Sequence, residues 1–266
     1  MYKRFIAVLG VVFLLLELAI VPFAAKLMFN DHFSELSPVE IIVLSMSFGS
    51  VFLCIVMSFS SLSERKNYPI HTFLFELMVF LCFLAPITEL TTRELDSVNM
   101  PKLNMICNTL FYLIGINIAY VIMRYEFLLI DTDKKPSLKK VRMIASAAML
   151  IDNIATLLNI PFGFFFTITP EGVYQSAPTY WLAYIPPILI IALIVIIAVK
   201  ELPAGKQRMT FMLFWVFAIS ASALQMWHSE LSLQYTGYTL SIVMIYLNIQ
   251  CELDSKHAVI TESKDS

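Results

Sequence analysis

Apolar residues gather in eight long segments with short polar stretches between them. The segments span residues 5–28, 39–62, 70–90, 104–128, 142–168, 180–200, 209–227 and 233–250. A membrane helix needs about 20 apolar residues, and barrel strands would be about half as long and would alternate in polarity. Runs such as FIAVLGVVFLLLELAIV do not alternate. The pattern predicts an all-α, polytopic transmembrane helix bundle over residues 1–250, followed by a short polar cytoplasmic tail over 251–266.

The first segment allows two interpretations. The order MYKR, apolar core and PFAAK loosely resembles a cleavable signal peptide. Its apolar run is longer than is usual for such a peptide, and Glu17 interrupts it. We therefore expect a retained helix, which gives one N-terminal helix plus a seven-helix bundle. Cleavage would leave seven helices and an N-terminus outside the cell.

Basic residues are concentrated in every second gap between the segments. Of the 18 Lys and Arg residues, 15 lie at the N-terminus, in or beside the second, fourth and sixth gaps, or in the tail. The positive-inside rule then predicts a multi-pass protein of the cell membrane with both termini in the cytoplasm. The chain is 59% hydrophobic, 14% charged and has a net charge of −2, which indicates the lipid bilayer as its surroundings and no nucleic-acid partner.

Polar residues inside the apolar segments are candidates for function, because ionisable groups are costly in the membrane. Asp152 lies near the middle of the fifth segment, Asn153 is next to it, and Asn159 is seven residues further on, close to the face of Asp152. These side chains form either a clamp between helices or a ligand site. Four further candidates for ligand contact are Asn117, Gln225, Tyr174 and Trp181. The amides can instead join helices, and the aromatic residues can instead belong to the interfacial belt.

Glu76 and Arg124 are expected to form a structural ion pair. They lie in the third and fourth segments, which form a hairpin, so the two residues reach a similar depth. Alternatively, Arg124 extends to the inner headgroups. We also expect Pro86, Pro161, Pro186 and Pro187 to kink their segments.

Known catalytic signatures are absent from the sequence. It has no HExxH, GxSxG or Walker A motif, and its four cysteines lack the spacing of metal ligands. The sequence therefore predicts no enzyme activity, no metal and no cofactor.

Three stretches of the second half resemble the seven-helix N-terminal membrane sensor region of bacterial histidine kinases and GGDEF diguanylate cyclases. They are NIPFGFFFTIT, PEGVYQSAPTYWLAYIPP and GYTLSIVMIYLNIQ, and the resemblance covers residues 40–250. In that family the last helix leads into an output domain, whereas here sixteen residues follow YLNIQ without an output motif. The resemblance implies a receptor-like module without kinase or cyclase activity of its own.

The leading hypothesis is a sensor that detects a small ligand or a membrane state and relays it through the last helix to a cytoplasmic signalling protein. A small-molecule transporter or permease and a non-catalytic membrane assembly protein are the alternatives. Homodimer formation is left open by the sequence.

Overall fold

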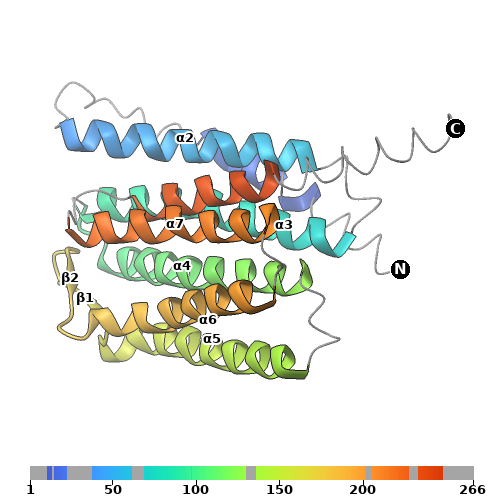
Figure 1. Cartoon of the computed structure of the whole chain (residues 1–266). Coiled ribbons are helices and arrows are strands. Elements are labelled where there is room, and N and C mark those ends of the chain that lie inside the picture. The colour runs from blue at the N-terminus through green and yellow to red at the C-terminus, as the bar shows by residue number, and fades with distance from the viewer. Residues whose placement is uncertain are drawn as a thin grey trace, which may run out of the picture.

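The computed structural model describes residues 11–13, 15–22, 38–61, 69–96, 98–129, 136–201, 205–227 and 233–247. Within these residues the chain is almost entirely helical, with one small antiparallel hairpin (Figure 1). The predicted tail over 251–266 lies outside them. The helices are Val11–Pro22, α2 (Pro38–Ser61), α3 (Pro69–Asp96), α4 (Pro101–Leu129), α5 (Pro136–Phe162), the 3₁₀ helix η4 (Tyr180–Tyr184), α6 (Ile185–Glu201), α7 (Lys206–Trp227) and a helix over 234–247.

Five helices are long and apolar enough to cross a membrane, which indicates a membrane protein. The candidate spans are Ile41–Ser60, Thr72–Asp96, Pro101–Leu128, Lys139–Phe162 and Tyr180–Glu201. The helical bundle predicted from the sequence is thus confirmed in class. A span at each of the other three predicted segments remains a prediction.

Proline marks where four of these helices begin. Pro38, Pro69, Pro101 and Pro136 are the first residues of α2, α3, α4 and α5. The first N–H groups of a helix have no intrahelical partner, and the fixed φ of proline suits this position. Pro186 and Pro187 lie in the first turn of α6, directly after the 3₁₀ helix η4, and a kink of the segment at these residues stays a prediction.

Three helix ends near the hairpin differ from the sequence prediction. α3 continues to Asp96 and α4 begins at Pro101, so most of the expected loop over 91–103 is helical. α5 ends at Phe162, before the predicted segment end at residue 168, and Gly163 follows with φ of 64°. Residues with a side chain rarely adopt this φ, so glycine allows the chain to leave the helix here.

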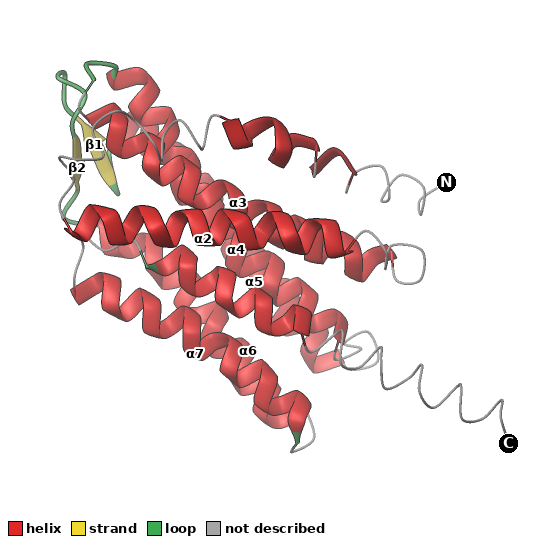
Figure 2. Cartoon of the chain, turned by 90° about the horizontal axis from the view of Figure 1, so that it is seen from above, coloured by secondary structure: helices red, strands yellow, loops and turns green. Residues whose placement is uncertain are grey.

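The hairpin after α5 caps one end of the bundle (Figure 2). Strand β1 (Phe166–Ile168) pairs antiparallel with β2 (Tyr174–Ser176), and Phe166 lies opposite Ser176. Phe165 and Phe166 are buried, and Tyr112 of α4 stacks on Phe166 with ring centroids 5.2 Å apart. Aromatic packing onto α4 therefore holds the hairpin in place.

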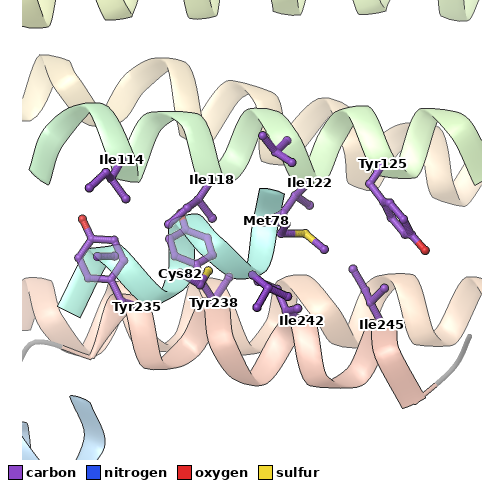
Figure 3. Packing of buried hydrophobic residues seen from close by; sticks show 14 of the residues in the cluster. Met78, Cys82, Ile114, Ile118, Ile122, Tyr125, Tyr235, Tyr238, Ile242 and Ile245 are labelled. Atoms are coloured by element: carbon purple, nitrogen blue, oxygen red, sulfur yellow. The ribbon is translucent and has the colours of Figure 1, made fainter. Parts of the chain in front are cut away.

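α4 occupies the centre of the bundle and contacts α3, α5 and α6. One face of α4 also meets the helix over 234–247 (Figure 3). There Ile114, Ile118 and Ile122, spaced four residues apart, lie opposite Tyr235, Tyr238, Ile242 and Ile245. Residues four apart share a helix face, so this row forms a continuous apolar seam.

Candidate functional site

The inner face of α5 carries three polar residues in a row of buried side chains. Ala145, Met149, Asp152, Thr156 and Asn159 are all buried. Their spacing of three or four residues places them on one side of the helix. The opposite side exposes large apolar residues to the surroundings, including Ile151, Ile154, Leu157 and Leu158. α5 therefore turns its polar side inward and its apolar side toward lipid.

Two polar atoms in this row have no hydrogen-bond partner among the described residues. They are Oδ2 of Asp152 and Oγ1 of Thr156, and the two residues are 3% and 0% exposed. Residues four apart lie one helical turn from each other on the same face. Asp152 is also close to the middle of the span Lys139–Phe162. An unsatisfied buried polar group costs about 1–3 kcal/mol, so a ligand that bonds both groups would be stabilised here.

Next to this pair, an amide bridge joins α5 to α4. The Nδ2 group of Asn117 donates to Oδ1 of Asn153 at 2.7 Å and to the Leu113 carbonyl oxygen, also at 2.7 Å. Nδ2 of Asn153 donates to the Met149 carbonyl oxygen at 2.9 Å. Of the seven candidate ligand residues, the structure thus brings Asp152, Asn153 and Asn117 to the same stretch of the bundle.

Asn159 serves the turn after α5. Its Oδ1 accepts hydrogen bonds from the backbone N–H groups of Phe165, at 2.6 Å, and Phe166, at 3.3 Å. Its Nδ2 donates to the Phe166 carbonyl oxygen at 3.1 Å. The oxygen and the nitrogen of the Asn159 side chain are thus both hydrogen-bonded to backbone groups, which gives Asn159 a structural role in this turn.

Tyr174 belongs to a second polar cluster, where the hairpin meets the turn between α3 and α4. Its backbone N–H donates to Oδ1 of Asp96 at 3.0 Å, and its hydroxyl lies 3.0 Å from that of Tyr112. Nδ2 of Asn104 donates both to Oδ1 of Asp96, at 2.8 Å, and to the Gly172 carbonyl oxygen, at 2.6 Å. Burial raises the pKa of the Tyr174 phenol. This cluster fixes the cap to the bundle.

The remaining candidates lie apart from the polar row of α5. Trp181 is in η4 and is 53% exposed. Gln225 belongs to α7, but its side chain is outside the described part of the structure. Glu76 is buried in the second turn of α3, and Arg124 is half-buried near the end of α4. α3 and α4 pack together, and the Glu76–Arg124 pair stays a prediction.

The sequence interpretation missed two features of these clusters. Thr156 was not singled out, although its position four residues after Asp152 is the usual signal for a shared helix face. The contacts of Asp96 with Asn104 and Tyr174 had no such signal, because Tyr174 is 78 residues away along the chain.

The five candidate spans and the polar row indicate a helical membrane protein in which two buried polar atoms of α5 lack a hydrogen-bond partner among the described residues. No protein-family model matches the chain, and neither a curated protein nor a solved structure shows significant similarity to it.

Proposed function

We propose that the chain is a receptor-like membrane sensor module whose ligand site is the Asp152–Thr156 pair. The observation that carries this proposal is a pair of buried oxygen atoms, one turn apart on the inner face of α5, that have no hydrogen-bond partner in the described part of the chain. Carboxyl groups in membrane helices generally face a partner, a ligand or water. A carboxylate beside a hydroxyl suits a small polar ligand that donates hydrogen bonds. The simplest species that the carboxylate can bind is a proton, and the resulting carboxylic acid can itself donate a hydrogen bond.

α4 supplies the connection from this site to the last described helix. Asn117 of α4 bonds to Asn153, beside Asp152. Two residues earlier, Gly115 faces the Tyr235 hydroxyl of the helix over 234–247. A ligand that binds one arrangement of the bundle better than another shifts the population toward it. We propose that a movement of α5 is passed through α4 to the last helix and from there to a cytoplasmic partner.

The test uses protons as the ligand. Spin labels at the exposed positions Ile144 of α5 and Leu247 of the last helix report the distance between the two helices in the full chain, reconstituted in nanodiscs. We expect the distance distribution to change between pH 5 and pH 9, and we expect Asp152→Asn to abolish the change while the protein stays folded. Glu171→Gln is the matched control, because Glu171 is an exposed carboxyl outside the spans. An identical pH response in Asp152→Asn would refute the site.

A transporter is the second candidate, since the same unpartnered pair suits a proton that crosses the membrane. Proteoliposomes with a pH-sensitive dye inside distinguish the two functions. Transport predicts proton movement driven by an imposed membrane potential and lost in Asp152→Asn. The sensor proposal predicts a conformational change without such movement. An assembly role predicts neither.

A further inference from the structure

A second buried carboxylate lies on the first helix, away from α5. Glu17 is 0% exposed, and its Oε1 accepts a hydrogen bond from Oγ of Ser58 on α2 at 3.0 Å. Its Oε2 is buried without a hydrogen-bond partner among the described residues. The hydroxyl of Ser58 thus hydrogen-bonds to one oxygen of this carboxylate, and the other oxygen is available to bind a further group.

A buried carboxylate on a different helix acts electrostatically on Glu17. Glu76 of α3 is 3% exposed and within electrostatic range of Glu17. Like charges repel, and the repulsion is stronger in a buried, poorly solvated place than in water. A buried carboxylate pair of this kind therefore favours positive charge between or beside its members.

We propose that Glu17, Ser58 and Glu76 form a binding site for one small monovalent cation, either a proton or Na⁺. The three side chains offer hard oxygen donors from the first helix, α2 and α3. Oxygen donors suit hard cations, and a Ca²⁺ site would need six to eight such ligands. The unsatisfied Oε2 of Glu17 is the atom that the cation would bond.

Two other titratable groups bear on this junction in the described part of the chain. The Cys54 thiol of α2 is buried within electrostatic range of Glu17 and lies one turn before Ser58. Arg124 of α4 is the predicted partner of Glu76. Where Arg124 neutralises Glu76, Glu17 and Ser58 supply the oxygen ligands of the cation.

Occupancy of the site should control how firmly the first helix docks. The Phe13 ring stacks on Phe80 of α3 with centroids 4.8 Å apart, so the helix already has an apolar contact to the bundle. Its polar contact to the bundle is made by Glu17, and a cation that compensates the negative charge of this carboxylate stabilises that contact. Loss of the cation is therefore expected to loosen the first helix and lower the stability of the bundle.

The experiment measures thermal unfolding of the full chain in nanodiscs, in NaCl or in choline chloride of equal ionic strength, at pH 5, 7 and 9. A cation that binds the folded state raises its stability with increasing concentration. In choline chloride we expect Tm to fall as the pH rises, because the proton leaves the folded site. At pH 9 we expect Na⁺ to restore Tm. Glu17→Gln should abolish the Na⁺ response and reduce the fall of Tm with pH, the remaining fall belonging to Asp152. Glu171→Gln should keep both responses.

The possible results distinguish a proton from Na⁺ as the bound cation, or show that the site does not exist. A fall of Tm with pH that Na⁺ does not reverse assigns the site to the proton alone. Responses to pH and Na⁺ that persist unchanged in Glu17→Gln, or a Tm that depends on neither cation, would overturn the proposal. If Glu17→Gln does not fold, Ser58→Ala provides the second variant, since it removes an oxygen donor without changing charge. It should weaken the Na⁺ response and preserve the fall with pH, and an unaltered Na⁺ response would contradict the assigned Na⁺ ligands.

Discussion

A Cβ atom placed on Gly115 of α4 would lie 3.0 Å from the Tyr235 hydroxyl oxygen on the helix over 234–247. The Phe111 ring, one turn earlier on α4, meets the Tyr235 ring edge-on with centroids 5.2 Å apart. Glycine therefore permits the close approach of the two helices that would relay a signal.

We expect Gly115→Ala to destabilise the protein through this contact. Alanine usually stabilises a helix interior by about 0.5–1 kcal/mol relative to glycine, but overpacking of a close contact costs about 1–3 kcal/mol. Chemical unfolding in detergent measures the difference. Gly49→Ala in α2 is the control, because a Cβ there would meet nothing within 4 Å. Tyr235→Phe should remove most of the penalty of Gly115→Ala, and an equal penalty in both backgrounds would contradict the contact.

The Asn117–Asn153 bridge should show a measurable coupling energy. Polar contacts between membrane helices average about 0.6 kcal/mol, with a maximum of about 1.7 kcal/mol. In a double-mutant cycle of Asn117→Leu and Asn153→Leu, the double change should therefore cost less than the sum of the single changes. Combining Asn153→Leu with Asn104→Leu is the control, since Asn104 lies about 20 Å further along α4. Additivity in the first cycle would argue against the bridge.

The predicted Glu76–Arg124 pair can be tested in the same way. Removing one partner of a buried ion pair leaves an uncompensated charge that costs about 3–5 kcal/mol. Glu76→Gln alone should then lower stability more than Glu76→Gln combined with Arg124→Gln. If the two single effects simply add, the residues are not in contact.

Asp96 should hold the hairpin against the bundle. Asp96→Ala removes the acceptor of the Tyr174 N–H and of the Asn104 amide, and hydrogen bonds to charged groups contribute about 1.5–3 kcal/mol. We expect faster amide hydrogen exchange at Tyr174, followed by mass spectrometry. Glu171→Ala is the control, because Glu171 is also acidic and lies in the loop that joins β1 to β2, close to Tyr174. A hydrogen bond from the Thr169 side chain lowers the pKa of the Glu171 carboxyl, but this exposed group should leave Tyr174 exchange unchanged.

The orientation predicted from the basic residues can be tested by cysteine labelling. Single cysteines at Ser137 and Gln175, in a chain without its native cysteines, should lie on opposite sides of the membrane. An impermeant reagent added outside intact cells should label position 175 and not position 137. The reverse result would invert the topology and place both termini outside.

The sequence by itself determined the class of protein and the places where helices form. About 20 apolar residues are enough to favour a membrane helix, and this depends on composition along the chain and not on its neighbours. The depth of Asp152, near the middle of a candidate span, followed for the same reason from its position in an apolar segment. Proline then marked the starts of α2, α3, α4 and α5.

The tertiary structure alone decided which helices and side chains meet. Asn117 bonds to Asn153, 36 residues away, and Glu17 bonds to Ser58, 41 residues away. Asn159 bonds to the backbone of Phe166 in the turn, seven residues further on. These contacts depend on how each helix is rotated and on where its neighbours lie. Lipid is as apolar as the helix surfaces, so hydropathy does not select between faces that pack and faces that meet lipid. Short-range fit and hydrogen bonding make that selection, and they act only once the helices are side by side.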